Sequence, residues 1–198
     1  MSDFKLNLDA EIKAGLDRGD PDRLTVRRLF SFNSPRVLAS YKEAGFQIIN
    51  AVSEHFQVPF RGIYVAGSVQ TGYSYFKDRD FVPKESDLDL AIVDSRLFQK
   101  YAEISFAHTN GYDDLTRFPV RNGTNQASSF KDYISRGYFR PDLMPQCPEK
   151  QEWFRFFNRL SLRHTNVFED INCGIYLSEL FFETKQTPII RKYRESAA

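Results

Sequence analysis

The sequence predicts an α/β (α+β) domain in which short buried strands are flanked by helices. Three short apolar segments, residues 62–67, 87–93 and 171–177, have the length and composition of buried strands. Residues 34–56 and 148–164 instead repeat apolar side chains at the spacing of an amphipathic helix. The chain has 198 residues, of which 41% are hydrophobic and 15% aromatic, so it can bury a substantial core. These observations favour a folded globular protein over a disordered chain.

A single domain accounts for the whole length, because chains of this size commonly fold around one core. We expect that domain to span residues 1–198, with neither internal repeats nor low-complexity tracts. Its motif core lies over residues 61–94. A helical segment over residues 1–58 precedes this core, and a further strand and helices over residues 127–195 complete the domain.

Composition and charge exclude several classes of protein. The formal net charge is +1, so no global field attracts nucleic acid and any basic site must be local. Cys147 and Cys173 are the only cysteines, and their spacing indicates neither a zinc cage nor a disulfide framework. The N-terminus lacks an apolar signal segment, and no apolar run approaches the ~20 residues needed to cross a bilayer. We therefore expect a cytoplasmic protein with no membrane partner.

Helix and turn signals predict the N-terminal elements. Residues 9–18 are expected to form a short helix, which ends at the turn-forming residues 19–21. Ser34, which is followed by proline, predicts the start of the helix over 34–56. Gly45 weakens the middle of this segment, so two helices remain an alternative to one.

The central part of the chain alternates between short elements and long connections. A polar, aromatic loop over 68–86 joins the first two predicted strands. A helix is expected over 95–106 and a short helix over 128–137. Turn formers between them, over 110–125, predict an irregular loop.

The C-terminal part returns to regular structure. Prolines at 141 and 145 exclude a regular helix over residues 140–145. The amphipathic helix over 148–164 and the strand over 171–177 follow. Ser178 predicts the cap of a last helix, which runs to about residue 194 and which Pro188 is expected to kink.

Residues 61–94 carry a pattern suited to phosphate and metal. Gly67 and Ser68 follow the first strand, where backbone N–H groups and a hydroxyl can contact phosphate and glycine permits close approach. Asp87 and Asp89 lie two residues apart at the start of the second strand, so both carboxylates point to one face. Neighbouring carboxylates repel each other, and a divalent cation such as Mg²⁺ removes that repulsion. Two such ions can stabilise both the attacking and the leaving oxygen of an in-line phosphoryl displacement.

This order of residues resembles the signature of the DNA polymerase β-like nucleotidyltransferase superfamily. The signature consists of Gly67–Ser68, a gap, and then Asp87-x-Asp89 between apolar residues; the run Ser-Asp-Leu-Asp-Leu is typical of small bacterial members. The resemblance covers residues 61–94, about a sixth of the chain. The gap is longer than in the minimal members, so the chain resembles a member with an inserted loop.

The resemblance implies a nucleotidyltransferase fold, a small mixed β-sheet flanked by helices, here with extra helices at both ends. It implies an enzyme that uses Mg²⁺ or Mn²⁺ to transfer a nucleoside monophosphate from an NTP to a hydroxyl of a protein, an RNA such as tRNA, another nucleotide or a small molecule. Gly67 and Ser68 would bind the β- and γ-phosphates. Asp87 and Asp89 would bind the metal that bridges the triphosphate. Small stand-alone members often belong to toxin–antitoxin or phage-defence loci.

The superfamily also implies a third carboxylate on a neighbouring strand, which binds the catalytic metal and activates the acceptor hydroxyl. We favour Asp170, immediately before the predicted strand at 171–177, as this catalytic and metal-binding residue. Position 172 on that strand is Asn172, a poor metal base, and Asp142 is a weaker alternative. Without a third acid at the site, the chain would be a nucleotide-binding module that acts with a partner protein.

The loop over 68–86 offers further contacts to a nucleotide. Gly72 lies within it, and Lys77, Arg79 and Lys84 can reach a triphosphate as point charges or remain solvated loop residues. Three aromatic residues of the loop either stack on a base or pack the loop onto the domain: Tyr73, Tyr75 and Phe76.

A third hypothesis concerns one side of the helix at 148–164. Arg155, Arg159 and Arg163 recur every four residues and form a basic stripe, which either holds phosphates of nucleic acid or is a solvated face. The near-zero net charge argues against nucleic-acid binding as the main function. The three histidines have no metal-ligand spacing and no paired cysteine, so no chemistry is assigned to them.

Overall fold

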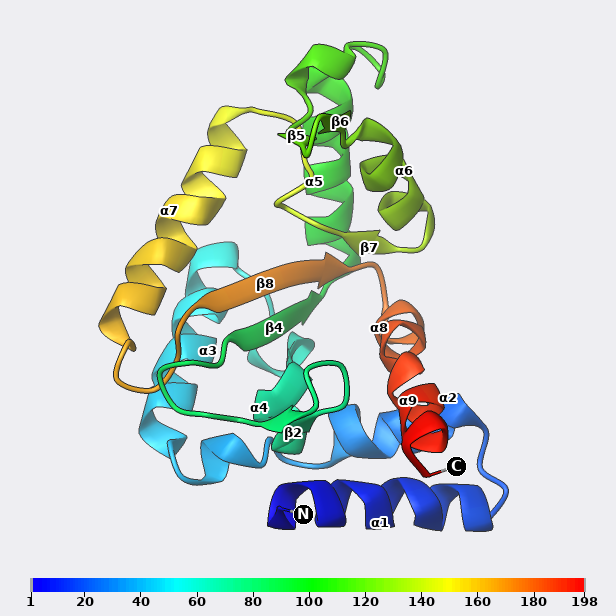
Figure 1. The fold of residues 1–198 in the computed structure, drawn as a ribbon. Coiled ribbons are helices and arrows are strands. Elements are labelled where there is room, and N and C mark those ends of the chain that lie inside the picture. The colour runs from blue at the N-terminus through cyan, green and yellow to red at the C-terminus, as the bar shows by residue number, and fades with distance from the viewer. Residues whose placement is uncertain (1, 198) are drawn as a thin grey trace.

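A computed structural model describes residues 2–197 and contains a four-stranded mixed sheet surrounded by helices (Figure 1). The strands are β1 (Ile63–Ala66), β4 (Leu88–Val93), β8 (Ile171–Tyr176) and β7 (Tyr138–Phe139), in the order β1-β4-β8-β7. β4 pairs antiparallel with β1 and parallel with β8, and the short β7 pairs antiparallel with β8. The three strands expected from the sequence are therefore confirmed, together with the α/β class.

Strict alternation along the strands divides the sheet into two apolar faces. Side chains of the first face belong to the larger core: Ile63, Val65, Leu88, Leu90, Ile92, Ile171 and Ile175. Side chains of the second face belong to a separate, smaller core: Tyr64, Ala66, Ala91, Val93, Tyr138 and Tyr176. Burial on both sides explains why these strands read as nearly continuous apolar runs.

Helices of the middle of the chain complete the larger core on the first face. They are α3 (Lys42–Phe56), α5 (Ser95–His108), α6 (Ala127–Ser135) and α7 (Pro148–Arg163). α7 runs along one side of the sheet and packs against β8 (Figure 1). The hydroxyl of Ser161 accepts a hydrogen bond from the backbone N–H of Ile171 at 2.9 Å, which fixes the start of β8 against α7.

Helices from both ends of the chain cover part of the second face. They are α1 (Asp3–Asp17), α2 (Asp22–Arg27), α8 (Glu179–Gln186) and α9 (Pro188–Ala197), which lie together in the lower right of Figure 1. α1 packs against α9, and α8 packs against β4 and β8. Their fully buried side chains include Leu8, Ile12, Phe182 and Ile190. The additional helices expected at the two ends of the chain are therefore present.

The N-terminal third departs from the sequence expectations in three places. α1 begins at Asp3 rather than at residue 9, because the Ser2 hydroxyl caps it by accepting from Lys5 N–H at 3.2 Å. The helix expected from Ser34 onward is wrong: a short 3₁₀ helix (Val37–Ala39) precedes α3, which begins at Lys42 without a side-chain cap. α2 and the π-helix that continues it (Arg28–Phe32) were not predicted at all.

Packing explains why the segment before α3 does not continue as helix. A Cβ on Gly45 would lie only 3.0 Å from Leu38 Cδ1, so the chain before α3 folds back onto that glycine. Leu38 is 8% exposed and belongs to the larger core. Gly45 therefore marks a close approach between two segments and lies within α3, while the break between the two helices falls earlier, at Ser40 and Tyr41.

The two long connections contain small hairpins. The first begins with α4 (Gly67–Thr71) and then pairs β2 (Tyr73–Ser74) with β3 (Arg79–Asp80). The second pairs β5 (Val120–Arg121) with β6 (Thr124–Asn125). The last helix is divided into α8 and α9 at Pro188, so the expected kink is a complete break. Within residues 2–197, none of the helices combines the length and apolar character that crossing a membrane requires.

A buried carboxylate joins the N- and C-terminal helices, and its removal should lower stability. Glu183 on α8 is 0% exposed and accepts from Arg27 Nη2 on α2 at 3.0 Å, with Arg23 Nε at 3.5 Å. We expect Glu183→Gln to lower the free energy of unfolding by about 1–3 kcal/mol, because a charge-assisted pair is lost. Urea unfolding checks this, with Glu195→Gln as the exposed control, for which we expect a change within about 0.5 kcal/mol. Equal effects of the two substitutions would contradict the structural role of Glu183.

Candidate functional site

The candidate site begins with a row of three residues across the sheet. Asp89 of β4 pairs with Ala66 of β1 on one side and with Asn172 of β8 on the other. Directly paired residues share a face, so all three side chains lie on the second face of the sheet. Ala66 and Ala91 leave space around Asp89, and Asp89 and Asn172 are both exposed there. This end of the second face is therefore the part left open.

Gly67 closes one side of the row. Its backbone has φ +62°, in the left-handed region, and a Cβ at this position would lie 2.7 Å from Asp89 Oδ2. Any other residue would therefore be strained and would also displace the carboxylate. The glycine after β1 is required both for the turn into α4 and for close approach to Asp89.

Backbone hydrogen bonds hold the segments before β4 and β8 together. Leu88 N–H donates to Asp170 O at 2.8 Å, and Glu169 N–H donates to Ser86 O at 3.1 Å. Leu88 pairs with Ile171, so the residues that precede them, Asp87 and Asp170, are also neighbours. Asp170 thus enters the site beside Asp87, whereas Asn172 lies beside Asp89.

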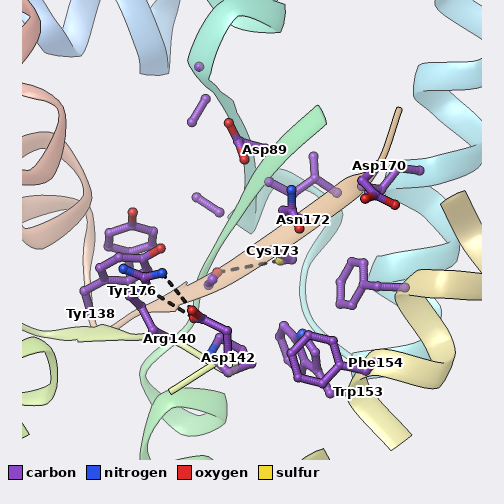
Figure 2. Close-up of a pocket in the computed structure, with 18 of the residues that line it drawn as sticks. Asp89, Tyr138, Arg140, Asp142, Trp153, Phe154, Asp170, Asn172, Cys173 and Tyr176 are labelled. Carbon is purple, nitrogen blue, oxygen red and sulfur yellow. Dashed lines mark hydrogen bonds and ion pairs between the residues drawn. The ribbon is translucent and has the colours of Figure 1, made fainter. Parts of the chain in front are cut away.

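A cleft of about 680 Å³ opens in front of this row (Figure 2). β7 pairs with β8 only at Ile175 and Tyr176, so among the described residues β8 has no strand neighbour on that side over 170–174. The cleft follows this free edge. One wall is α7, and the other is the segment that leaves β7. Its lining includes Gly67, Asp89, Asp170, Asn172, Phe154 and Asn158.

Tyr138 and Tyr176 line the end of the cleft that is nearest to α8. The rings of Tyr138 and Tyr176 are stacked with centroids 4.4 Å apart. Tyr138 lies across Gly174, where a Cβ would meet the Tyr138 ring at 2.4 Å. Burial raises the pKa of Tyr138 to about 12, so its hydroxyl stays protonated at neutral pH. Gly174 therefore gives Tyr138 its place on the sheet.

A fixed guanidinium stands at the same end of the cleft. Arg140 donates two hydrogen bonds to Asp142, at 3.1 Å and 2.7 Å (Figure 2). Its guanidinium lies 5.0 Å from the Tyr133 ring centre. Arg121 donates to the same carboxylate at 2.9 Å. The two arginines neutralise Asp142, so this residue, the weaker alternative for the third acid, is already engaged by cations.

The charge of Asp89 is poorly compensated in the protein alone. Its side chain is exposed to the cleft, but protein surrounds the carboxylate on the other sides. Desolvation is the main cause that raises the pKa of Asp89; the Asp87 charge raises it further and the Lys77 ammonium lowers it. A cation beside Asp89 would remove the cost of ionising it.

The residues expected at the site are distributed unequally around the cleft. Gly67, Asp89 and Asp170 line it. Ser68 follows the lining residue Gly67, and Asp87 lies two residues before the lining residue Asp89, but neither is itself part of the wall.

Among the other expected contacts, Lys77 is close enough to lower the pKa of Asp89. Lys84 is exposed and lies outside the cleft wall, with its backbone bonded to Val167. Gly72 has another role as the end of α4, where a Cβ would lie 2.1 Å from the Phe4 ring.

The aromatic residues of the connection after α4 separate into two groups. Tyr73 and Tyr75 are 5% and 9% exposed, and each donates a hydrogen bond from its hydroxyl, to Asp78 and Asp9 respectively. They pack the loop onto the domain. Phe76 is 65% exposed and lines the cleft, so it alone of the three can contact a ligand there.

The three acids do not form a closed metal cage in the described part of the chain. The only group of three potential ligands within 4.8 Å of one another in residues 2–197 is elsewhere and contains none of these aspartates. Asp87 immediately before β4, Asp89 within β4 and Asp170 immediately before β8 are therefore brought to one end of the sheet without forming such a group. The arginine stripe, Arg155, Arg159 and Arg163, is exposed on α7 outside the cleft wall.

Several cleft residues carried no recognisable signal in the sequence. Tyr138, Arg140, Phe154 and Asn158 come from segments far from the Gly-Ser and Asp-x-Asp pattern. The turn-forming composition around Arg140 predicted only an irregular connection. Phe154 and Asn158 lie on the exposed side of α7, where the amphipathic pattern does not distinguish a cleft wall from a solvated face.

Comparison with protein-family models, with curated proteins and with solved structures finds no match to this chain.

The close contact between Gly67 and Asp89 predicts a specific loss of stability. Gly67→Ala adds both left-handed strain and a clash with the carboxylate. Gly123→Ala is a matched control, because Gly123 has φ +75° but nothing within 4 Å of its Cβ position. We expect Gly67→Ala to lower the free energy of unfolding by about 1–2 kcal/mol more than the control. Equal losses in urea unfolding would show that Asp89 does not restrict this position.

The raised pKa of Asp89 predicts a substitution that stabilises the protein. A carboxyl whose folded pKa exceeds its unfolded pKa contributes stability below the unfolded value and loses it as pH rises through the folded value. Asp89→Asn removes the cost at high pH, so its Tm should exceed that of the wild type at pH 7. The difference should vanish below pH 3.8, the ordinary value. Asp113→Asn, an exposed change, is the control, and equal Tm values at pH 7 for all three proteins would contradict the prediction.

Proposed function

We propose that this chain is a metal-dependent nucleotidyltransferase, which transfers a nucleoside monophosphate from an NTP to a hydroxyl acceptor. The observation that carries the proposal is the Asp89 carboxylate, exposed on the floor of a cleft and held against the backbone of Gly67. A carboxylate with uncompensated charge beside a glycine that admits close approach is suited to a divalent cation with bound phosphate. Asp170 on the adjoining segment lines the same cleft.

The donor set fits Mg²⁺ or Mn²⁺, because Asp87, Asp89 and Asp170 supply only carboxylate oxygens. A bound divalent ion would supply charge neutralisation for the triphosphate and for the attacking oxygen. Asp87 and Asp89 would hold it, and the backbone of Gly67 and the Ser68 hydroxyl would contact the β- and γ-phosphates. Lys77, whose charge already acts on Asp89, would add a point charge.

In the proposed reaction, an acceptor hydroxyl oxygen bonds to the α-phosphorus of the NTP. The bond from that phosphorus to the bridging oxygen breaks, and pyrophosphate leaves. Asp170 would take the proton of the acceptor hydroxyl, which requires a carboxylate within hydrogen-bonding reach of the acceptor. The acceptor itself is a protein side chain, an RNA such as tRNA, another nucleotide or a small molecule, and a toxin–antitoxin or phage-defence setting belongs to the same proposal.

The rest of the cleft suits a nucleotide. Its volume of about 680 Å³ lies within the range of small-molecule sites. Phe76 and Phe154 offer exposed aromatic faces to a base, at 65% and 36% exposure. Arg140 stands at the far end with its orientation fixed by Asp142. These exposed aromatic faces and the fixed cation would orient a base and a second phosphate-bearing group.

One observation favours a second candidate, a nucleotide-binding module that acts with a partner protein. The residue paired with Asp89 on β8 is Asn172, and an amide neither carries a charge nor accepts a proton as a base. Asp170 is displaced by two residues toward the start of the strand. If Asp170 does not reach the acceptor, nucleotide would bind with little turnover.

Both candidates predict metal-dependent binding of an NTP. We expect titration calorimetry with each of the four NTPs and Mg²⁺ to give binding for at least one nucleotide, lost by about 100-fold or more in Asp87→Ala/Asp89→Ala. The double variant Asp113→Ala/Asp132→Ala, which changes two exposed aspartates outside the cleft wall, should bind like the wild type. No binding of any NTP by the folded wild type would overturn both candidates.

Pyrophosphate release in the same samples separates the enzyme from the binding module. For an enzyme we expect Mg²⁺-dependent release that Asp170→Asn lowers by 10²-fold or more, in the range of general-base loss. For the binding module, the wild type and Asp170→Asn would both release none. Asn172→Asp then adds a carboxylate beside Asp89, and turnover gained by this variant would identify position 172 as the missing acid.

A further inference from the structure

A second group of potential metal ligands lies outside the cleft, between α5 and α7. His108 is the last residue of α5, Cys147 immediately precedes α7, and Glu149 lies in the first turn of α7. One nitrogen, one sulfur and one carboxylate oxygen of these residues lie within 4.8 Å of one another. Both helix ends lie in the upper part of Figure 1, and none of the three residues lines the cleft.

The contacts within this group leave one carboxylate oxygen of Glu149 without a hydrogen-bond partner. His108 Nε2 lies 3.4 Å from Glu149 Oε2, and the pair does not form a hydrogen bond. Glu149 Oε2 is inaccessible to solvent and has no hydrogen-bond partner in the described part of the chain. A buried carboxylate oxygen without a partner is costly, and native proteins rarely keep one. Cys147 is 5% exposed, and its sulfur lies within 4.8 Å of the imidazole nitrogen and the carboxylate oxygen.

The separations instead fit ligands around a shared ion. Ligands about 2.0–2.3 Å from a tetrahedral Zn²⁺ lie roughly 3.3–3.8 Å apart. The 3.4 Å between His108 Nε2 and Glu149 Oε2 matches such an edge. The Cys147 sulfur lies within 4.8 Å of the other two ligand atoms, so these distances would need to shorten by about 1 Å at most.

The chemistry of the donors selects the metal. Thiolate and imidazole ligands favour Zn²⁺ and related transition metals over Mg²⁺, which prefers oxygen. We propose that His108, Cys147 and Glu149 bind one Zn²⁺, with water in the fourth position, and that the ion fastens the C-terminal end of α5 to the N-terminal end of α7. On binding, the Cys147 thiol releases its proton to solvent and a sulfur–zinc bond forms.

Cobalt substitution tests the site with the full-length protein. After removal of metals with a chelator, one equivalent of Co²⁺ should give a near-ultraviolet thiolate-to-cobalt band and the visible absorption of a tetrahedral ion. Zn²⁺ should displace the cobalt at one ion per chain and raise the Tm. Absence of the thiolate band in the folded wild type would overturn the proposal.

Variants assign the ligands. Cys147→Ser should remove the thiolate band. His108→Ala and Glu149→Gln should each weaken Zn²⁺ binding by on the order of 100-fold, because losing a residue that only supports a ligand already costs up to about that much. Cys173→Ser and His55→Ala are matched controls and should keep the band and the stoichiometry. A band that persists in Cys147→Ser and disappears in Cys173→Ser would overturn the assignment.

Two measurements keep the test decisive. Glu149→Gln changes a partly exposed side chain and preserves its shape, so it reports on metal binding even if Cys147→Ser fails to fold. Asp87→Ala/Asp89→Ala should leave one Zn²⁺ per chain, which makes this site independent of the proposed function. Loss of zinc in that double variant, with retention in Glu149→Gln, would show that the metal binds in the cleft instead.

Discussion

The pairing of β4 on both of its edges is the constraint on which the rest of the site depends. β4 lies antiparallel to β1 and parallel to β8, so each of its residues has a fixed neighbour on either side. A slip by one residue would exchange the two faces and bury Asp89 in place of Leu88 or Leu90. Burial of the apolar side chains of β4 in the larger core therefore fixes the register of the strand. The register in turn fixes the position of the Asp89 carboxylate. The register of β4 therefore determines both the packing of the larger core and the position of Asp89.

The two ends of the second sheet face have different cover, and this difference creates the cleft. Toward Val93 and Tyr176, α8 packs against the sheet and seals it. Toward Asp89 and Asn172, no helix of the described chain seals the face, and β7 is too short to pair with the start of β8. An apolar surface left uncovered at this position would favour aggregation. Small and polar residues can be exposed there without that effect. The polar residues of β4 and β8 therefore mark the part of the sheet face that no helix covers.

Much of this arrangement could be predicted from the sequence because the signals are local. Buried strands at 62–67, 87–93 and 171–177 were visible as apolar runs, and the alternation around Asp87 and Asp89 placed both on one face. The amphipathic α7 was equally clear. The Ser34 cap failed because tertiary contact between Leu38 and Gly45 overrides a local capping preference. Two-residue strands such as β7 carry too little pattern to be found at all.

The remaining site residues could not be predicted because they meet only through long-range packing. Arg140 reaches the cleft because β7 pairs with the far end of β8, and Arg121, which donates to the same Asp142 carboxylate, comes from a separate hairpin. The same reason hides the cluster of His108, Cys147 and Glu149. Cys147 and Glu149 are two residues apart, but a Cys-x-Glu pair gives no signal without the histidine that the end of α5 supplies. Spacing in sequence detects sites built on one element, not sites built between two.

α7 connects the two regions physically. Its first turn carries Glu149, and Phe154 and Asn158 in the middle of the same helix form a wall of the cleft. Nine residues separate Glu149 from Asn158, about 14 Å along a rigid helix. Whatever fixes the N-terminal end of α7 therefore limits how far that wall can move relative to Asp89, since the other end is held to β8 through Ser161. A ligand that needs the wall closer would act against the attachment at the helix start, and a ligand that fits the present width would be favoured by it. The width of the cleft therefore depends on the contacts at the two ends of α7 together with Trp153, Phe157 and Leu160, which pack the middle of the helix into the larger core.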